Sequence, residues 1–339
     1  MRIAVVNPSD EFEMGVKGGN QIIAEALAEN IKKHTNHEVT TIFTPLKVSS
    51  NLSLLKSYFL HRMIDLSGFD MVISLKFPSF SVKHKNHICY FAHFFRQFYD
   101  LWPEFSKNAN ILTKLTRITI KSIDKKAFKK IKKVYSYSEF IKSRLKESGI
   151  DSELIYCPPV IEDYKTGNYE YILSTSILNN DRKRISLLIK AMDHIKEDIN
   201  LIIVGDGPHK DMLQNLAKNN PRIIFLGYQS PKKLVNLYSN ALCTCLVSYR
   251  EDYGLVTIES MKSKKPVITC VDSGGPLEFV EHGKTGLISN PNPKEIAENI
   301  EFLIENRDVA KNMGEKAYEK VKNITWKNLI NKMIVKNGF

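Results

Sequence analysis

The stretch LCTCLVSYREDYGLVTIESMKSKKPVITCV occupies residues 242–271 and decides the class of fold. It begins as a continuous apolar run, passes through the polar segment EDYG (251–254), continues as a helix-like segment and ends in a β-branched run. Continuous apolar runs are typical of parallel strands that are buried on both faces. The stretch therefore predicts a strand–helix–strand unit of a right-handed parallel sheet.

The same alternation extends along the whole chain of 339 residues. Strands are expected at 2–7, 38–43, 70–75, 87–92, 133–138 and 153–156, and then at 171–176, 201–205, 222–227, 242–247 and 266–271. Between these two groups, CPPVIEDYKTGN (157–168) has two prolines and little periodicity, which is typical of a linker. We therefore expect an α/β protein with two doubly wound Rossmann-like domains facing across a cleft, and a ligand site beyond the carboxyl ends of the strands.

Composition indicates a folded protein with an anionic partner. The chain is 43% hydrophobic and carries a formal net charge of +12, which favours phosphate-bearing small molecules, acidic lipid or nucleic acid. No secretory leader and no apolar run long enough to span a bilayer are expected, so we predict a cytoplasmic protein. The odd number of cysteines agrees with a reducing compartment, and Cys243 and Cys245 are interpreted as buried strand thiols.

Two carboxylates flank the start of the helix predicted after 251–254. The N–H groups of Leu255 and Val256 begin this helix, and together with the helix dipole they can hold a diphosphate. Glu259 follows about one turn later, and Glu251 stays in the loop. Both carboxylates suit hydrogen bonds from sugar hydroxyls; the alternative is an ordinary surface Glu251 and a Glu259 favoured only by the dipole.

Other residues that follow strands are weaker signals. A second glycine-containing helix start, like the one at Gly254, is expected at Gly274-Gly275-Pro276. Gly18 and Gly19 precede a helix and can leave amides free for an anion, or form an ordinary flexible loop. On their own, His93 is interpreted as a packed histidine and the basic run 182–184 as a solvated turn.

Taken together, the residues of 251–288 resemble the donor-site signature of the family-4 retaining glycosyltransferases, which have the GT-B fold. That signature has a Glu, seven residues, a second Glu, a small-residue helix, PV, a strand, GG, a Glu and a G-x-T-G turn. The similarity extends to VGDGP (204–208), to RIIFLGYQ (222–229) and to the basic run before ISLLIKAM. Ser263-Lys264-Lys265 lacks the glycine that is common before PV, and Asp252 replaces the usual small glycine.

The resemblance implies a role for each matching residue. The amides of Gly254, Leu255 and Val256 would receive the diphosphate of a nucleotide sugar, with Lys183 on its phosphates. Gly18 and Gly19 would approach the diphosphate from the other domain.

On the sugar side, the resemblance implies that Glu251 contacts the donor sugar hydroxyls and that His93 faces the same sugar, which makes these two the catalytic candidates. Glu259 would hold the ribose hydroxyls. The family arginine about six residues before the lysine is missing near Ile177, and either Arg182 or Arg184 could replace it.

The family's chemistry is retaining, metal-independent hexosyl transfer from a UDP- or GDP-linked sugar, with no cofactor, to a glycan or lipid-linked acceptor of surface polysaccharide or glycolipid synthesis. The implied domains are an acceptor-binding domain over 1–160, a nucleotide-sugar-binding domain over 161–320 and a helix over 321–339 that returns to the first domain, anchored by Trp326. Two alternatives stay open: a same-fold nucleotide-sugar epimerase, and a catalytically silent sugar-nucleotide-binding subunit.

A basic amphipathic helix is predicted over 111–134. It carries nine lysine and arginine residues against the single acid Asp124, while Leu115 and Ile118 belong to an apolar row at helical spacing. The pattern indicates either docking to an anionic membrane surface, at the inner face of the cell membrane, or a core-facing helix with a solvated cationic side. No recognised nucleic-acid motif accompanies the charge, so no nucleic acid partner is expected.

Overall fold

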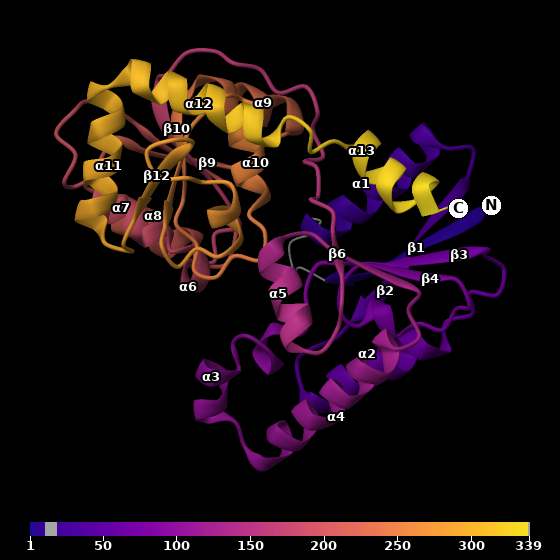
Figure 1. The fold of residues 1–339 in the computed structure, drawn as a ribbon. Helices are drawn as coiled ribbons and strands as arrows, with labels where there is room; N and C mark the ends of the chain where they lie inside the picture. Colours follow the sequence, from indigo (N-terminus) through magenta and orange to yellow (C-terminus); the bar gives the residue numbers. More distant parts are fainter. Residues whose placement is uncertain (11–18, 338–339) are drawn as a thin grey trace. The chain divides into compact units, whose positions relative to one another are not determined.

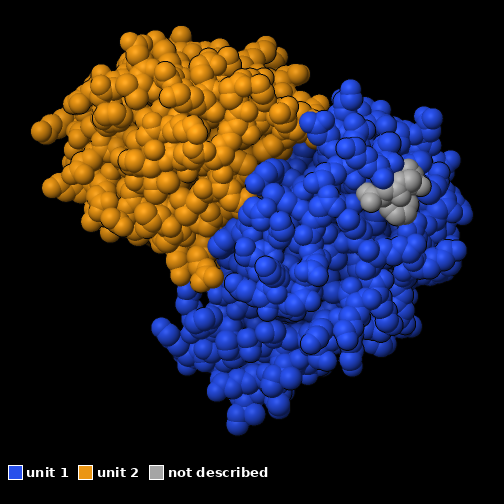
Figure 2. Space-filling view, viewed as in Figure 1, with its two compact units in different colours: residues 1–160, 326–339 blue, residues 161–325 orange. Residues whose placement is uncertain are grey.

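The computed structural model describes residues 1–10 and 19–337 and divides into two compact units (Figures 1 and 2). Unit 1 comprises Met1–Val160 and Trp326–Phe339, and unit 2 comprises Ile161–Thr325. Within the described ranges, no helix combines the length and the hydropathy needed to cross a lipid bilayer.

Unit 1 is built on a six-stranded sheet in which all neighbouring strands are parallel. In sheet order the strands are β2 (Glu38–Leu46), β1 (Arg2–Asp10), β3 (Met71–Ser74), β4 (His87–Phe91), β5 (Lys133–Ser136) and β6 (Glu153–Leu154). The helices are α1 (Gly19–His34), α2 (Asn51–Met63), α3 (Trp102–Phe105), α4 (Ile111–Phe128), α5 (Glu139–Glu147) and α13 (Trp326–Met333). Central strands β3 and β4 are buried along their whole length, as their apolar runs predict.

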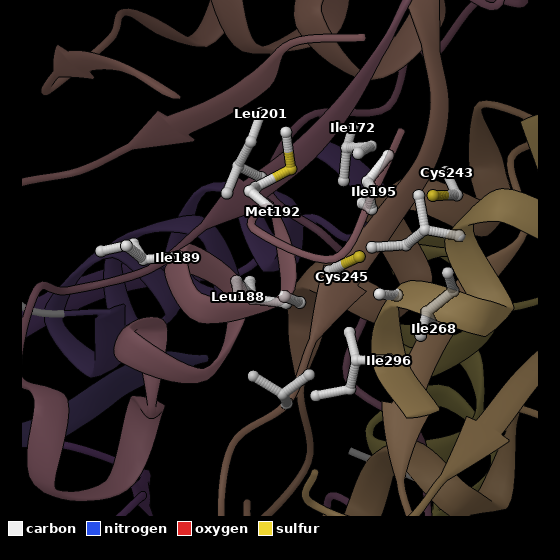
Figure 3. Close-up of a cluster of buried hydrophobic side chains, with 14 of the residues drawn as sticks. Ile172, Leu188, Ile189, Met192, Ile195, Leu201, Cys243, Cys245, Ile268 and Ile296 are labelled. Atoms are coloured by element: carbon white, nitrogen blue, oxygen red, sulfur yellow. The ribbon is translucent and has the colours of Figure 1, made fainter. Parts of the chain in front are cut away.

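Unit 2 repeats the architecture with a second six-stranded parallel sheet. In sheet order the strands are β12 (Gly286–Ser289), β11 (Val267–Cys270), β10 (Ala241–Leu246), β7 (Tyr171–Thr175), β8 (Leu201–Val204) and β9 (Ile223–Gly227). The helices are α6 (Asn180–Lys183), α7 (Ile185–Ala191), α8 (Lys210–Ala217), α9 (Pro231–Asn240), α10 (Leu255–Lys262), α11 (Pro293–Glu305) and α12 (Arg307–Val321). Figure 3 shows part of the core of this unit, where Leu188 of α7 and Ile296 of α11 pack near Cys245 and Ile268 of the sheet.

The predicted α/β class with two doubly wound sheets is confirmed. Each predicted strand range overlaps an observed strand. β12 was not predicted, because its four residues GLIS follow a glycine turn and are too short to form a recognisable apolar run. All five cysteines are buried and none of these five forms a disulfide; Cys89, Cys243, Cys245 and Cys270 lie in strands, as expected for strand thiols.

One predicted helix boundary is wrong. The helix expected over 111–134 ends at Phe128, and Lys133 instead pairs with Ile88 as the first residue of β5. After Gly274, whose φ is 79°, the chain forms a 3-10 turn over Gly275–Glu278 rather than an α-helix.

Two buried side chains hold the segments that border the linker. The Trp326 indole is fully buried and donates a hydrogen bond to the Pro159 carbonyl over 2.9 Å, which joins the start of α13 to the end of the first part of unit 1. In unit 2, the Lys265 ammonium donates to the Asn168 carbonyl over 2.7 Å and lies 3.3 Å from the centre of the Tyr169 ring. Burial lowers the pKa of Lys265 to about 7.

Candidate functional site

Two loops of unit 2 lie side by side beyond the carboxyl ends of β10 and β11. Their backbones are joined by three hydrogen bonds: Arg250 N to Asp272 O at 2.9 Å, Glu251 N to Ser273 O at 2.7 Å, and Gly275 N to Glu251 O at 2.8 Å. Glu251 and Gly274 also form an isolated parallel bridge. These bonds fix the backbone of the residue that the sequence singles out as a catalytic candidate.

Gly254 closes the first loop and begins α10. Its φ of 76° lies in the left-handed region, and a Cβ built on it would lie 2.7 Å from Cγ of Pro276. Only glycine therefore fits where the two loops touch. The next residues, Leu255 and Val256, form the first turn of α10, where the N–H groups have no acceptor within the helix. The partial positive charge of the helix dipole adds to these amides, so the position suits an anion.

A salt bridge joins a cation from one loop to the carboxylate of another. Nζ of Lys183, at the end of α6, lies 2.5 Å from Oε2 of Glu251, and both side chains are partly exposed. The Arg182 carbonyl accepts a hydrogen bond of 2.8 Å from the Tyr249 amide, which holds α6 against the end of β10. Because a partly exposed ion pair contributes only about 0–1 kcal/mol, an incoming phosphate can compete with Glu251 for Lys183.

Arg184 has a structural position that the sequence does not reveal. Its guanidinium donates bidentately to Asp272, at 2.9 and 2.7 Å, and its Nε donates to the Val247 carbonyl over 2.7 Å. Its backbone is left-handed, with a φ of 50°. These contacts tie the segment after α6 to the ends of β10 and β11, so Arg184 braces the loops; Arg182 keeps the role of candidate replacement for the family arginine.

Glu259 lies on α10 beside two tyrosines that sequence reasoning did not find. The Tyr238 hydroxyl donates to Oε2 of Glu259 over 2.6 Å, and the Thr175 hydroxyl lies 2.6 Å from the same tyrosine oxygen. The Tyr164 hydroxyl is buried near this carboxylate without a hydrogen-bond partner among the described residues. Burial raises the pKa of Glu259, and the Tyr238 hydroxyl, which donates to the carboxylate, lowers it partway back. The result is a partly desolvated carboxylate with a buried donor beside it.

The remaining candidates lie in unit 1. Gly18 falls outside the described residues, and Gly19 begins α1, directly after the undescribed segment. His93 follows β4, and its Nδ1 lies 2.8 Å from the Phe94 carbonyl. Because a carbonyl only accepts, the imidazole proton lies on Nδ1, and Nε2 accepts from the Asn20 side-chain amide at 3.3 Å. Asn20, in the first turn of α1, is a further polar residue at this edge that the sequence did not indicate.

Comparison with known proteins places these residues in context. A family model described as glycosyl transferases group 1 matches residues 162–320, which include the two loops, α10 and the tyrosines. An uncharacterized glycosyltransferase of Methanocaldococcus jannaschii is 29% identical over 203 residues, which cover 58% of this chain and 57% of that protein. The chain therefore matches little more than half the length of this relative.

Solved structures match over nearly the whole chain. A sucrose-phosphate synthase from Thermosynechococcus elongatus covers 98% of each chain with a TM-score of 0.76 and 17% identity. A structure of the Anabaena protein HepE in complex with UDP and glucose covers 99% of each chain, with a TM-score of 0.71 and 17% identity. At this level of identity the comparison establishes the fold, which is the GT-B fold predicted from the sequence.

Proposed function

We propose that the chain transfers a sugar from a nucleoside-diphosphate sugar to an acceptor hydroxyl, because residues 162–320 match the family model described as glycosyl transferases group 1. The observation that carries this proposal is the pair of interlocked loops in unit 2. They fix the backbone of Glu251 and the amino terminus of α10, and Lys183 reaches the same place.

The diphosphate would bind the free amides at Leu255 and Val256, with its charge further neutralised by Lys183 and Arg182. Amides and cations that hold the leaving diphosphate stabilise the charge that develops as the glycosidic bond breaks. Once Lys183 turns to the phosphates, the Glu251 carboxylate is released to accept hydrogen bonds from the donor sugar. In this proposal Lys183 and Glu251 pair with each other while no donor is bound, and each binds a part of the donor when it arrives.

The ribose would bind at Glu259. A ribose diol can donate to the carboxylate and accept from the Tyr164 hydroxyl, which has no hydrogen-bond partner among the described residues. Tyr238 keeps one carboxylate oxygen occupied and fixes the side chain. Partial desolvation makes the remaining oxygen a stronger acceptor than a carboxylate in water.

In the proposed reaction the hexose is transferred from a UDP- or GDP-linked donor with retention of configuration and without a metal ion. Binding of UDP and glucose by the HepE structure supports a uridine donor. We propose a glycan or lipid-linked acceptor, as in the synthesis of surface polysaccharide or glycolipid. The donor-binding roles that the family resemblance implies for Gly18, Gly19 and His93 stay predictions. The enzyme would work in the cytoplasm at the inner face of the cell membrane.

The proposal can be tested by thermal shift with UDP, GDP, ADP, CMP and NAD. We expect one nucleoside diphosphate to raise the melting temperature selectively, as ligand binding to the folded state requires. Glu259→Ala should lose this stabilisation, whereas Glu298→Ala, which removes an exposed carboxylate of α11, should keep it. Stabilisation by none of the five, or by NAD alone, would contradict a nucleotide-sugar site.

A transfer assay distinguishes the proposal from its two alternatives. Glu251→Ala should still bind the nucleotide but lose sugar transfer, because only the contact with the donor sugar is removed. A protein that binds the nucleotide but neither transfers nor isomerises any sugar would be a silent binding subunit. Conversion of the nucleotide sugar into its epimer without an acceptor would identify an epimerase.

A further inference from the structure

The outer side of α2 and α4 in unit 1 carries an unusual set of exposed apolar side chains. On α4 these are Ile111, Leu112, Leu115 and Ile118, which are 56–77% exposed. On α2 they are Leu52, Phe59, Leu60 and Met63, which are 45–76% exposed. Single exposed apolar residues are ordinary, but a run of them on neighbouring helices indicates an interaction surface.

α4 buries the opposite face from the one that its apolar pattern suggests. Its buried residues are Thr116, Ile120, Asp124, Ala127 and Phe128. Asp124 is held inside by the Tyr99 hydroxyl, which donates to it over 2.6 Å. Of the two alternatives predicted for this helix, the core-facing one is wrong for Leu115 and Ile118, since both side chains are exposed.

The apolar rows of the two helices begin at the same place. α2 lies beside α4 (Figure 1), and the Asn51 side-chain amide at the start of α2 donates to the Thr113 hydroxyl of α4 over 3.0 Å. Leu52 and Leu112 are the sequence neighbours of these two residues. The exposed rows therefore adjoin where the two helices begin, and we call the two rows together the α2–α4 face.

Along α4, the same outward side changes from apolar to cationic. The lysines of this second half and of the turn that follows are Lys125, Lys126, Lys129, Lys130 and Lys132. Among the described residues, none of these five ammonium groups forms a salt bridge. Like charges at i and i+4, such as Lys125 and Lys129, repel one another and destabilise the helix. An uncompensated positive cluster is expected where an anionic surface supplies the counter-charge.

The outer side of α4 carries apolar side chains first and lysines without salt bridges after them. This order of apolar and cationic groups suits the surface of an anionic bilayer. The apolar part fits the boundary between headgroups and acyl chains, and the lysines fit the phosphates. We propose that the α2–α4 face docks unit 1 on a membrane rich in anionic phospholipid. This inference extends the proposed function by identifying the surface from which a lipid-linked acceptor would be reached.

Sedimentation with vesicles tests the docking without any sugar transfer, so its result is independent of the transfer assay. The intact protein should sediment with vesicles of phosphatidylcholine mixed with phosphatidylglycerol and stay in solution with phosphatidylcholine alone. Replacing Lys125, Lys126, Lys129 and Lys130 by Gln should weaken binding by roughly a hundredfold or more, since each lysine near an anionic surface contributes about fivefold. Leu115→Gln with Ile118→Gln should weaken it at least ~10-fold through lost apolar burial.

Matched variants in unit 2 control for charge and for surface apolarity. Replacing the exposed Lys190, Lys218, Lys232 and Lys233 by Gln removes the same net charge and should leave vesicle binding within about twofold, as should Met212→Gln with Leu216→Gln. Circular dichroism and the melting temperature establish that each variant is folded.

Several outcomes would overturn the proposal. One is an intact protein that does not sediment with anionic vesicles, and another is a lysine variant that binds as tightly as the intact protein. Unchanged binding by the Leu115/Ile118 variant would exclude apolar insertion. If that variant instead converted a dimer into a monomer, without affecting vesicle binding, the face would be a contact between two copies of the chain.

Discussion

Replacing Gly254 by Ala should lower the free energy of unfolding for two reasons: the left-handed backbone and the crowding between the two site loops. Comparison with a second glycine variant separates the two contributions. The left-handed conformation costs an alanine about 1–2 kcal/mol. The new Cβ would also lie 2.7 Å from Pro276 and 3.0 Å from Leu246, and such overpacking costs about 1–3 kcal/mol. Gly283 has nearly the same φ, 74°, but a Cβ there meets nothing within 4 Å, so Gly283→Ala carries the backbone cost alone.

Calorimetric melting of the two variants measures the difference. At about 2–4 °C per kcal/mol, Gly254→Ala should melt roughly 2–12 °C below Gly283→Ala, in the transition of unit 2. It should also lose stabilisation by the nucleoside diphosphate, because the start of α10 must move away from Pro276, whereas Gly283→Ala should keep it. Equal melting temperatures and equal ligand responses in the two variants would refute the argument that the loops are in tight contact at Gly254.

Three further predictions concern buried polar groups. Tyr238→Phe removes the donor to Glu259 and should destabilise unit 2 by about 1–3 kcal/mol. It should also raise the pKa of Glu259 further, so that nucleotide affinity falls more steeply on acidification. Titration calorimetry across pH measures this dependence, and an unchanged pH profile would argue against the prediction. Burial raises the pKa of Asp124 to about 7 from 3.8, so between these pH values the folded chain holds more protons than the unfolded chain. The free energy of unfolding of unit 1 should therefore fall as pH rises through this range. Urea denaturation should show this slope in the native protein, and the slope should be lost in Asp124→Asn. Lys265 should give a pH dependence of the opposite sign. Because its pKa is lowered from 10.5 to about 7, the folded chain holds fewer protons than the unfolded chain, and the free energy of unfolding of unit 2 should rise with pH across that range. If the slope persists in Lys265→Met, it belongs to another group.

The sheets were predictable because their strands carry the information locally. Buried parallel strands read as continuous apolar runs, and the loops after β10 and β11 follow from where those runs stop. The end of α4 is less clear in the sequence, because the predicted helix over 111–134 and the predicted strand over 133–138 overlap at residues 133 and 134. The sheet decides between them, since Lys133 pairs with Ile88, which is distant in the sequence.

The candidate site divides along the same line. Glu251, Gly254 and Glu259 were found because they sit in one short segment with a recognisable spacing. Tyr238 and Tyr164 were missed, since both come from other segments and meet Glu259 only in the folded unit. Arg184 and Lys183 are neighbours in the sequence, and their different roles appear only in the structure. Arg184 makes a bidentate contact with Asp272, whereas Lys183 forms a partly exposed salt bridge with Glu251.

The position of α13 has a consequence for how the chain is made. Unit 1 is interrupted by the whole of unit 2, so α13, which packs on α1, is translated after unit 2. A ribosome-bound chain can complete unit 2 before Trp326, which is buried and donates to the Pro159 carbonyl, has joined unit 1. Of the two units, the one that begins first is therefore completed second. A chain that stops before Trp326 would leave exposed the surface of unit 1 that α13 covers, and protein quality control can recognise such a surface.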